Sequence, residues 1–164
     1  MRIGAQTSLF FDAPVLVAGA HSPTGGSALL LEACKAGGLK AQTTSLILLE
    51  ALNALRRFPQ RSLDRFYQQL AGIDWELLPA PSAETLRHYE RYVAAKDVHV
   101  LAAAVEGKAE FLLTLHRRHI LAAAEAVEGA HLPIIILRPG DFIRQYYRQH
   151  QDYPSLSPAT GETE

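Results

Sequence analysis

The chain has 164 residues, of which 16 are basic and 17 are acidic, and the formal net charge of −1 excludes recruitment of nucleic acid by a global positive field. Hydrophobic residues make up 48% and charged residues 20%, which is ordinary for a globular protein of one domain. The single cysteine, Cys34, excludes an internal disulfide and fits a reducing cytoplasm. The longest run without formal charge, residues 13–31, contains His21, Pro23, Gly25 and Gly26, so it does not predict a membrane span. We therefore expect a cytoplasmic protein.

Strand-like and helix-period segments alternate along the chain. In chain order the pattern predicts a strand at 8–11, a helix at 26–36, a strand at 40–43, helices at 45–57 and 63–70, a strand at 75–78, helices at 83–93 and 98–106, a strand at 111–114, a helix at 117–127, a strand at 134–137 and a helix at 141–148. This alternation predicts a three-layer α/β fold, with a mostly parallel sheet flanked by helices. Residues 1–150 are expected to form the single domain, and residues 151–164 a disordered tail.

Three acidic residues stand in apolar surroundings. Asp12 ends the uncharged, strand-like run 7–11, Glu50 lies inside the helical run 45–52, and Asp97 opens the run 97–104. A carboxylate among apolar neighbours is costly unless it is paired or binds a cation. Ligands of open α/β sheets bind beyond the carboxyl ends of the strands, which all three acids can reach. Carboxylate oxygens suit magnesium or manganese, and such a cation activates water and stabilises charge on a phosphate.

Each acid also has a structural interpretation. Asp12 and Asp97 are favoured helix N-caps. Glu50 shares a helical stripe with Asn53 and Arg57, as a solvated surface acid would. Both interpretations stay open for each acid, and the metal interpretation gains when the three are considered together.

Four segments also resemble, in order, the successive motifs of PIN-domain proteins. They are the run 10–19 (FFDAPVLVAG), the acid Glu50, the run 97–104 (DVHVLAAA) and the run 111–119 (FLLTLHRRH), and the resemblance spans residues 9–147. It implies a PIN-like fold. Many members of the family are metal-dependent ribonucleases, and many of those are toxins of toxin–antitoxin pairs.

By this resemblance Asp12, Glu50 and Asp97 correspond to three of the family's catalytic, metal-binding acids, and Thr114 to its usual Ser or Thr. The chain departs from the pattern twice. Pro14 stands where Asn, Ser or Thr is common, and it offers no side-chain hydrogen bond. His116 stands where another Asp is common. As a metal ligand His116 would suit manganese or zinc better than magnesium, and contact with phosphate or with solvent alone is the alternative.

Basic residues stand at the ends of two of the predicted elements. Arg56 and Arg57 end the predicted helix 45–57, and Arg117 and Arg118 follow the strand at 111–114. These four are candidate contacts of an RNA backbone, while solvated helix ends are the structural alternative.

The function expected from the sequence is a ribonuclease that depends on Mg²⁺ or Mn²⁺, of the kind found as toxins. The alternative is a catalytically weak PIN-like module that binds RNA or a protein. The partners compatible with these functions are RNA, an antitoxin protein and a second copy of the chain, with no membrane.

Overall fold

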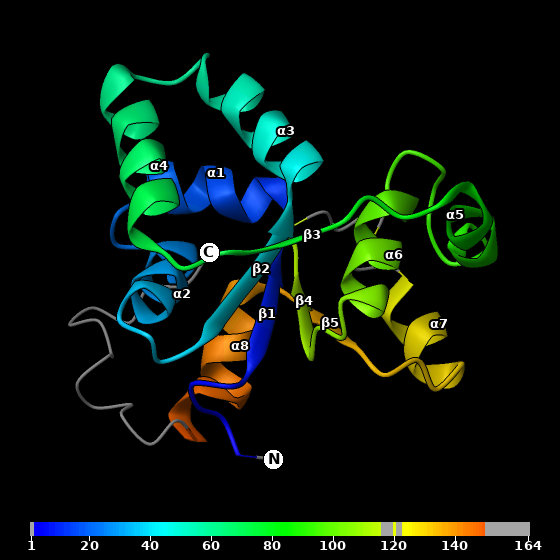
Figure 1. Ribbon diagram of the computed structural model, residues 1–164. Coiled ribbons are helices and arrows are strands. Elements are labelled where there is room, and N and C mark those ends of the chain that lie inside the picture. Colours follow the sequence, from blue (N-terminus) through cyan, green and yellow to red (C-terminus); the bar gives the residue numbers. More distant parts are fainter. Residues whose placement is uncertain (1, 116–119, 121–122, 150–164) are drawn as a thin grey trace.

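The predicted fold class is confirmed: the protein is an α/β structure with a parallel sheet between helices (Figure 1). The computed structural model describes residues 2–115, 120 and 123–149. The predicted tail, residues 151–164, lies outside this part, as do His116, Arg117 and Arg118. The described sheet has five strands, namely β1 (Ser8–Phe11), β2 (Lys40–Thr44), β3 (Glu76–Leu78), β4 (Phe111–Leu113) and β5 (Ile135–Leu137).

The strands lie in the order β3-β2-β1-β4-β5, and each pairs in parallel with its neighbour. The chain moves outward from β1 to β2 and β3, then returns to the other side of β1 for β4 and β5. The direction of this progression therefore reverses between β1 and β4. In open α/β sheets such a switch point creates a crevice at the carboxyl ends of the strands, where ligands bind.

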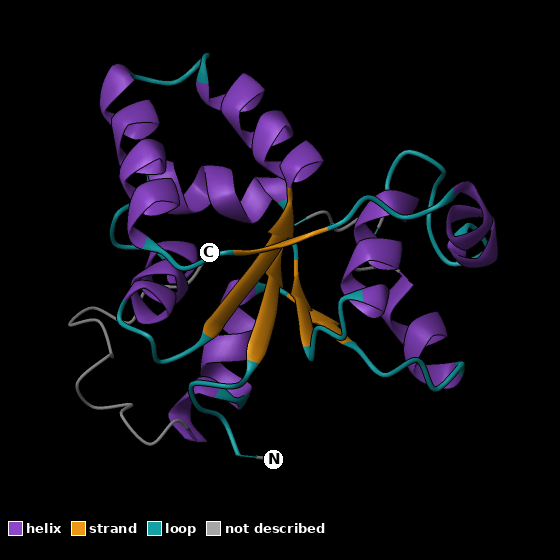
Figure 2. Ribbon diagram, viewed as in Figure 1, coloured by secondary structure: helices purple, strands orange, loops and turns teal. Residues whose placement is uncertain are grey.

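Helices cover both faces of the sheet (Figure 2). Figure 1 shows α1, α2 and α4 on one side and α5, α6 and α7 on the other, while α8 packs against α2. None of the helices in the described residues is long and apolar enough to cross a membrane. Their bounds are α1 (Ala13–His21), α2 (Gly26–Lys35), α3 (Ser45–Leu55), α4 (Gln60–Gly72), α5 (Ala83–Tyr89), α6 (Val98–Glu106), α7 (Ala124–Gly129) and α8 (Pro139–Gln145), followed by the 3₁₀ helix η2 (Tyr147–Gln149).

The core centres on the two inner strands. All three side chains of β4 and the last three of β1 are fully buried, as expected for parallel strands covered on both faces. Gly19 lets α1 lie close to α2, because a Cβ atom there would come within 2.4 Å of Leu31 Cδ1. Cys34 is buried, and burial raises the pKa of its thiol.

Several predicted helices were wrong in extent, and α1 was not predicted at all. Residues 13–21 are apolar on every side, so they carry no helical period, and Pro14 and Gly19 disfavour a helix interior. Pro14 is tolerated because it lies in the first turn of α1. The helix predicted at 83–93 ends at Tyr89, and the last helix begins at Pro139 instead of 141. The helix predicted at 117–127 falls partly outside the described residues, and within them α7 spans Ala124–Gly129.

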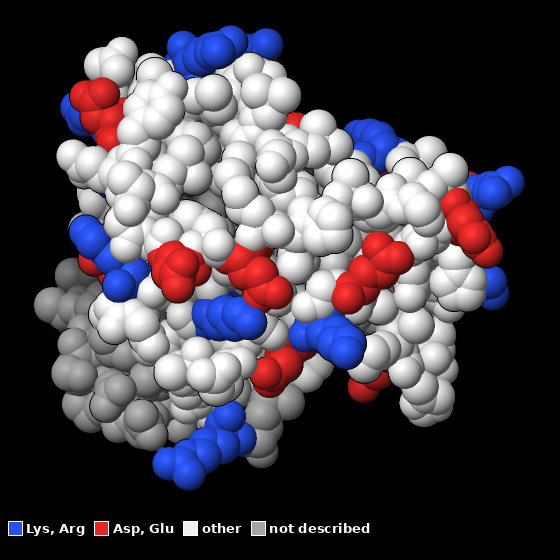
Figure 3. All heavy atoms as spheres, viewed as in Figure 1, with Lys and Arg blue, Asp and Glu red and all other residues white. Residues whose placement is uncertain are grey.

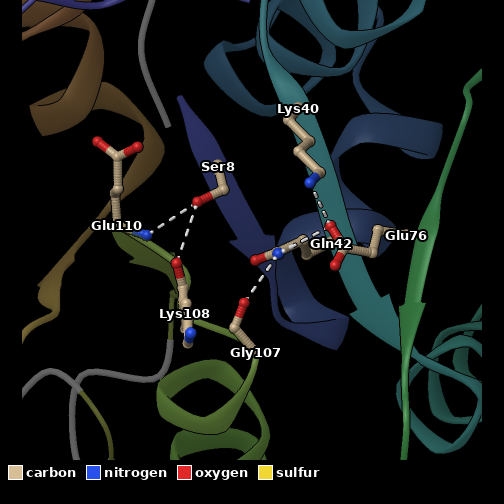
Figure 4. A network of polar contacts seen from close by, with 7 residues as sticks. All are labelled: Ser8, Lys40, Gln42, Glu76, Gly107, Lys108 and Glu110. Atoms are coloured by element: carbon tan, nitrogen blue, oxygen red, sulfur yellow. Dashed lines mark hydrogen bonds and ion pairs between the residues drawn. The ribbon is translucent and has the colours of Figure 1, made fainter. Parts of the chain in front are cut away.

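Polar side chains tie the strands together near their amino ends (Figure 4). Lys40 Nζ lies 2.7 Å from Glu76 Oε2, which joins β2 to the edge strand β3. Gln42 Nε2 donates to Glu76 Oε2 and to the carbonyl of Gly107 just after α6, both at 3.1 Å. Ser8 joins β1 to the turn before β4. We call this group the amino-end network; it consists of Ser8, Lys40, Gln42, Glu76, Gly107, Lys108 and Glu110.

Candidate functional site

Asp12 and Thr114 face each other across the switch point of the sheet. Asp12 directly follows β1, Thr114 directly follows β4, and both are buried. Thr114 Oγ1 donates to Asp12 Oδ2 at 2.8 Å, and the backbone N–H of Ala13 donates to Asp12 Oδ1 at 2.8 Å. Asp12 is thus the N-cap of α1, as its structural interpretation predicts. It is also fixed in orientation beside β4, and the partial positive charge of the helix N-terminus stabilises its carboxylate.

Glu50 comes from the exposed side of α3. The helix begins where Thr44 accepts a hydrogen bond from the N–H of Ile47 at 3.2 Å, and it buries Ile47, Ala51 and Leu55. Glu50 lies off this apolar stripe with a side chain that is 44% exposed, as its structural interpretation predicts. Its Oε1 is 3.4 Å from His99 Nε2, in the first turn of α6. The surface acid is therefore directed toward α6.

Asp97 precedes α6 and is only 6% exposed. Its backbone carbonyl accepts from the N–H of Val100 at 3.1 Å, but its side chain makes no capping hydrogen bond to the helix. N-capping therefore does not explain the position of this carboxylate.

The three acids line one cavity of about 420 Å³. One wall is a face of α1, and the other is formed by α3 and the residue Phe58 that follows it. Successive lining residues on each wall lie about one helical turn apart, so the cavity extends along both helices. Besides the three acids its lining consists of Ala13, Pro14, Val17, Ala18, His21, Ala54, Phe58 and Val100.

The donor chemistry of this cavity fits a hard divalent cation, since carboxylate oxygens are the ligands that Mg²⁺ and Mn²⁺ prefer. Across residues 2–115, 120 and 123–149, no three His, Cys, Asp or Glu side chains are positioned to hold an ion together. Glu50 is the most exposed of the three acids, with a side chain that is 44% exposed, whereas Asp12 and Asp97 are buried.

The predicted basic contacts are brought together only in part. Arg56 and Arg57 are exposed in the turn between α3 and α4. Figure 3 shows Lys and Arg side chains at the top of the view, where Figure 1 places this turn. Arg117, Arg118 and the candidate ligand His116 are outside the described residues.

Three lining or neighbouring residues were not predicted from the sequence. His99 follows Asp97 by two residues, a spacing that places it in the first turn of α6 near the acids. His21 lies eight residues after Ala13, and Phe58 lies eight residues after Glu50. Residues eight positions apart share one face of a helix. That helical spacing is a usable signal only once residues 13–21 are known to be a helix.

No family model matches this chain, and no curated protein matches it either. The resemblance to PIN-domain proteins therefore stays a prediction, and the geometry of the cavity carries the functional argument.

Proposed function

We propose that the protein is a divalent-metal-dependent ribonuclease with a PIN-like site, in which Asp12, Glu50 and Asp97 hold Mg²⁺ or Mn²⁺. One observation carries the proposal: three acids that are far apart in the sequence line a single cavity at the switch point of a parallel sheet. When bound, the cation would activate water and stabilise negative charge on the phosphodiester.

The residues around the acids have roles of their own in this proposal. Thr114 orients Asp12 by donating a hydrogen bond to its Oδ2, and the backbone N–H of Ala13 donates to its Oδ1. Pro14 and Val17 give the cavity an apolar wall. An apolar wall lowers the local dielectric constant, which strengthens the attraction between carboxylate and cation.

The nature of the substrate rests on two supports. Arg56 and Arg57 provide exposed positive charge beside the cavity, suited to a phosphate backbone. The family resemblance adds RNA as the substrate and extends the proposal to a toxin with an antitoxin partner. A cytoplasmic location, which the single cysteine fits, and a homodimer are part of the same proposal.

A second candidate is a catalytically weak module that binds RNA or a protein through the same cavity. Within the described residues, the absence of three side chains already positioned to hold an ion favours it. Pro14 favours it too, because its ring contributes no hydrogen bond to the cavity.

A nuclease assay separates the two candidates. Single-stranded RNA is incubated with the protein in Mg²⁺, in Mn²⁺ and in EDTA, and initial rates are compared for the wild type, Asp12→Asn and Asp97→Asn. We expect cleavage only with metal and a loss of at least about 100-fold in both variants, because a metal ion contributes several kcal/mol to such a transition state.

Asp64→Asn, at an exposed position on α4, is the control and should leave the rate unchanged. Equal rates in EDTA and in metal would contradict the proposal, whereas RNA binding without cleavage would support the second candidate.

A further inference from the structure

The end of the cavity away from the acids is built from two aromatic rings. His21, the last residue of α1, and Phe58, in the turn after α3, have ring centroids 4.6 Å apart at an interplanar angle of 63°. In such an edge-to-face pair one ring offers only its edge, so the contact leaves that ring's own faces uncovered. Both residues are exposed and both line the cavity. The cavity therefore offers an aromatic surface to a ligand.

Contacts with α4 fix the position of His21. His21 Nδ1 lies 3.1 Å from the hydroxyl of Ser62, which is fully buried in α4. Arg65, one turn further along α4, donates to the carbonyl of Ala20 and so anchors α4 to the end of α1. His21 is thus held in place by a connection between α1 and α4, and Phe58 contacts its ring.

The aromatic end lies about 12 Å from the acid end, since eight residues of α1 separate Ala13 from His21 at 1.5 Å each. Between the two ends, half-buried Val17 and Ala18 line the wall that α1 forms. A ligand that fills the cavity must therefore be elongated, with one part suited to the carboxylate site and another suited to an aromatic surface.

Positive charge flanks the aromatic end. Arg56 and Arg57 directly precede Phe58, Arg61 follows it in the first turn of α4, and all three are exposed. An aromatic ring flanked by arginines matches single-stranded nucleic acid, in which bases stack on aromatic side chains while the backbone contacts cations. An apolar peptide segment would gain nothing from the arginines.

We propose that His21 and Phe58 form a base-binding subsite for single-stranded RNA. An unpaired base stacks on the exposed aromatic surface, the neighbouring phosphates contact Arg56 and Arg57, and the scissile phosphate lies at the acid end. The last of these placements rests on the proposed nuclease function, whereas the base subsite itself does not. A base in a duplex cannot reach the ring, so the subsite selects single strands.

The test measures binding in EDTA, so that no cleavage intervenes. A short single-stranded RNA carrying 2-aminopurine is titrated with the protein, and both anisotropy and base fluorescence are recorded. Phe58→Ala should weaken binding about 5- to 150-fold and remove the quenching of the base, because stacking on an aromatic ring contributes that much per base. Phe58→Trp should bind at least as tightly as the wild type. Phe58→Leu, which keeps apolar bulk without a ring, should be as weak as Phe58→Ala.

The matched control is Tyr67→Ala. Tyr67 is a 49% exposed aromatic residue on α4, but it does not line the cavity, so its removal should change neither signal. Thermal melts of each variant verify that the fold is intact. Wild-type affinity in Phe58→Ala would overturn the subsite, because it would show that the residue contributes nothing to binding. Wild-type affinity in Phe58→Leu would also overturn it, because it would show that the residue contributes only apolar packing.

The salt dependence of binding tests the path of the backbone. The double variant Arg56→Ala, Arg57→Ala should flatten the slope of log K against log salt by about 1.4, since each phosphate contact contributes about 0.7 on a single strand. Lys40→Ala, which removes a charge from the opposite end of the sheet, should leave the slope unchanged. Equal slopes for the wild type and the double variant would overturn this path.

Failure of this inference is distinguishable from failure of the proposed nuclease. If RNA is cleaved with metal but Phe58 has no effect on binding, the nuclease stands and the subsite falls. If no RNA is cleaved but binding depends on the ring at position 58, the subsite stands and the second candidate function is supported.

Discussion

The two ends of the parallel sheet hold their charged groups in opposite ways. At the amino end Lys40 and Glu76 form an ion pair of 2.7 Å, and Gln42 hydrogen-bonds to the same carboxylate oxygen. At the carboxyl end three residues of like charge, Asp12, Glu50 and Asp97, line one cavity. At the amino end, residues of opposite charge are paired across two strands. At the carboxyl end, acidic residues surround a cavity.

This difference separates an end that is bonded within the protein from the end where we propose a metal site. The amino-end network joins β2 to the edge strand β3 and to the end of α6, so its polar groups stabilise the fold directly. The hydrogen bond from Lys40, and then that from Gln42, lower the pKa of Glu76, as expected for a carboxylate satisfied within the protein. Acids that share a cavity repel one another, and a cation bound among them would stabilise that arrangement.

The largest expected effect is therefore a metal response confined to the carboxyl end. Manganese at about 100 times its dissociation constant should stabilise the wild type by about 2.7 kcal/mol, because it binds only the folded state. For a chain of this length that corresponds to a rise of about 5–10 °C in Tm. Asp12→Asn and Asp97→Asn should remove the rise, which differential scanning calorimetry with and without manganese measures.

Glu76→Gln is the matched variant for this measurement, because it removes an acid from the amino end. It should keep the full manganese response. A response lost in Glu76→Gln, or retained in both aspartate variants, would show that the comparison between the two ends is wrong.

A smaller effect is expected from the hydroxyl group that orients Asp12. Thr114→Val removes a donor to a buried carboxylate, which should cost about 1.5–3 kcal/mol of unfolding free energy and weaken the manganese response. Thr43 is an equally buried threonine of β2, whose hydroxyl donates to the neutral carbonyl of Phe11 at 3.0 Å. Thr43→Val should therefore cost only about 0.5–1.5 kcal/mol and leave the manganese response intact. Urea denaturation of both variants checks the order, and equal costs would mean that the charge on Asp12 adds nothing to its bond with Thr114.

The sequence predicted the sheet better than the helices around it. Each strand is a short β-favouring run between turn signals, and all five were predicted within one residue at either end. The helix α1 was missed because its residues are apolar on every side, which removes the periodicity by which a helix is recognised. The strand order was not predicted, since the apolar pattern of a strand does not reveal which strands become its neighbours.

The sequence singled out the acids that line the cavity, but not most of the residues around them. Asp12, Glu50 and Asp97 stood out as charges in apolar runs, and the structure brings all three to one cavity. His21 and Phe58 could not be predicted, because neither is unusual locally and their contact depends on how α1 packs against α3 and α4. The local sequence pattern thus identified the acids whose burial is energetically costly. Which residues become their neighbours depends on how the helices pack.

The smallest expected effect lies at the amino end and concerns pH. Because the pKa of Glu76 is lower in the folded chain than its ordinary value of 4.5, the ion pair with Lys40 contributes stability above about pH 4.5. That contribution is lost as the pH falls through the lowered pKa of the folded state. Both side chains are about 40% exposed, at 43% and 39%, so the whole effect should stay below about 1 kcal/mol.

Glu76→Gln should thus be slightly less stable than the wild type at neutral pH, and the difference should shrink in acid. Glu32→Gln, at an exposed position on α2, is the control and should track the wild type at every pH. If the wild type and Glu76→Gln keep a constant difference in acid, the charge on Glu76 contributes nothing, and the amino end is held by its other hydrogen bonds alone.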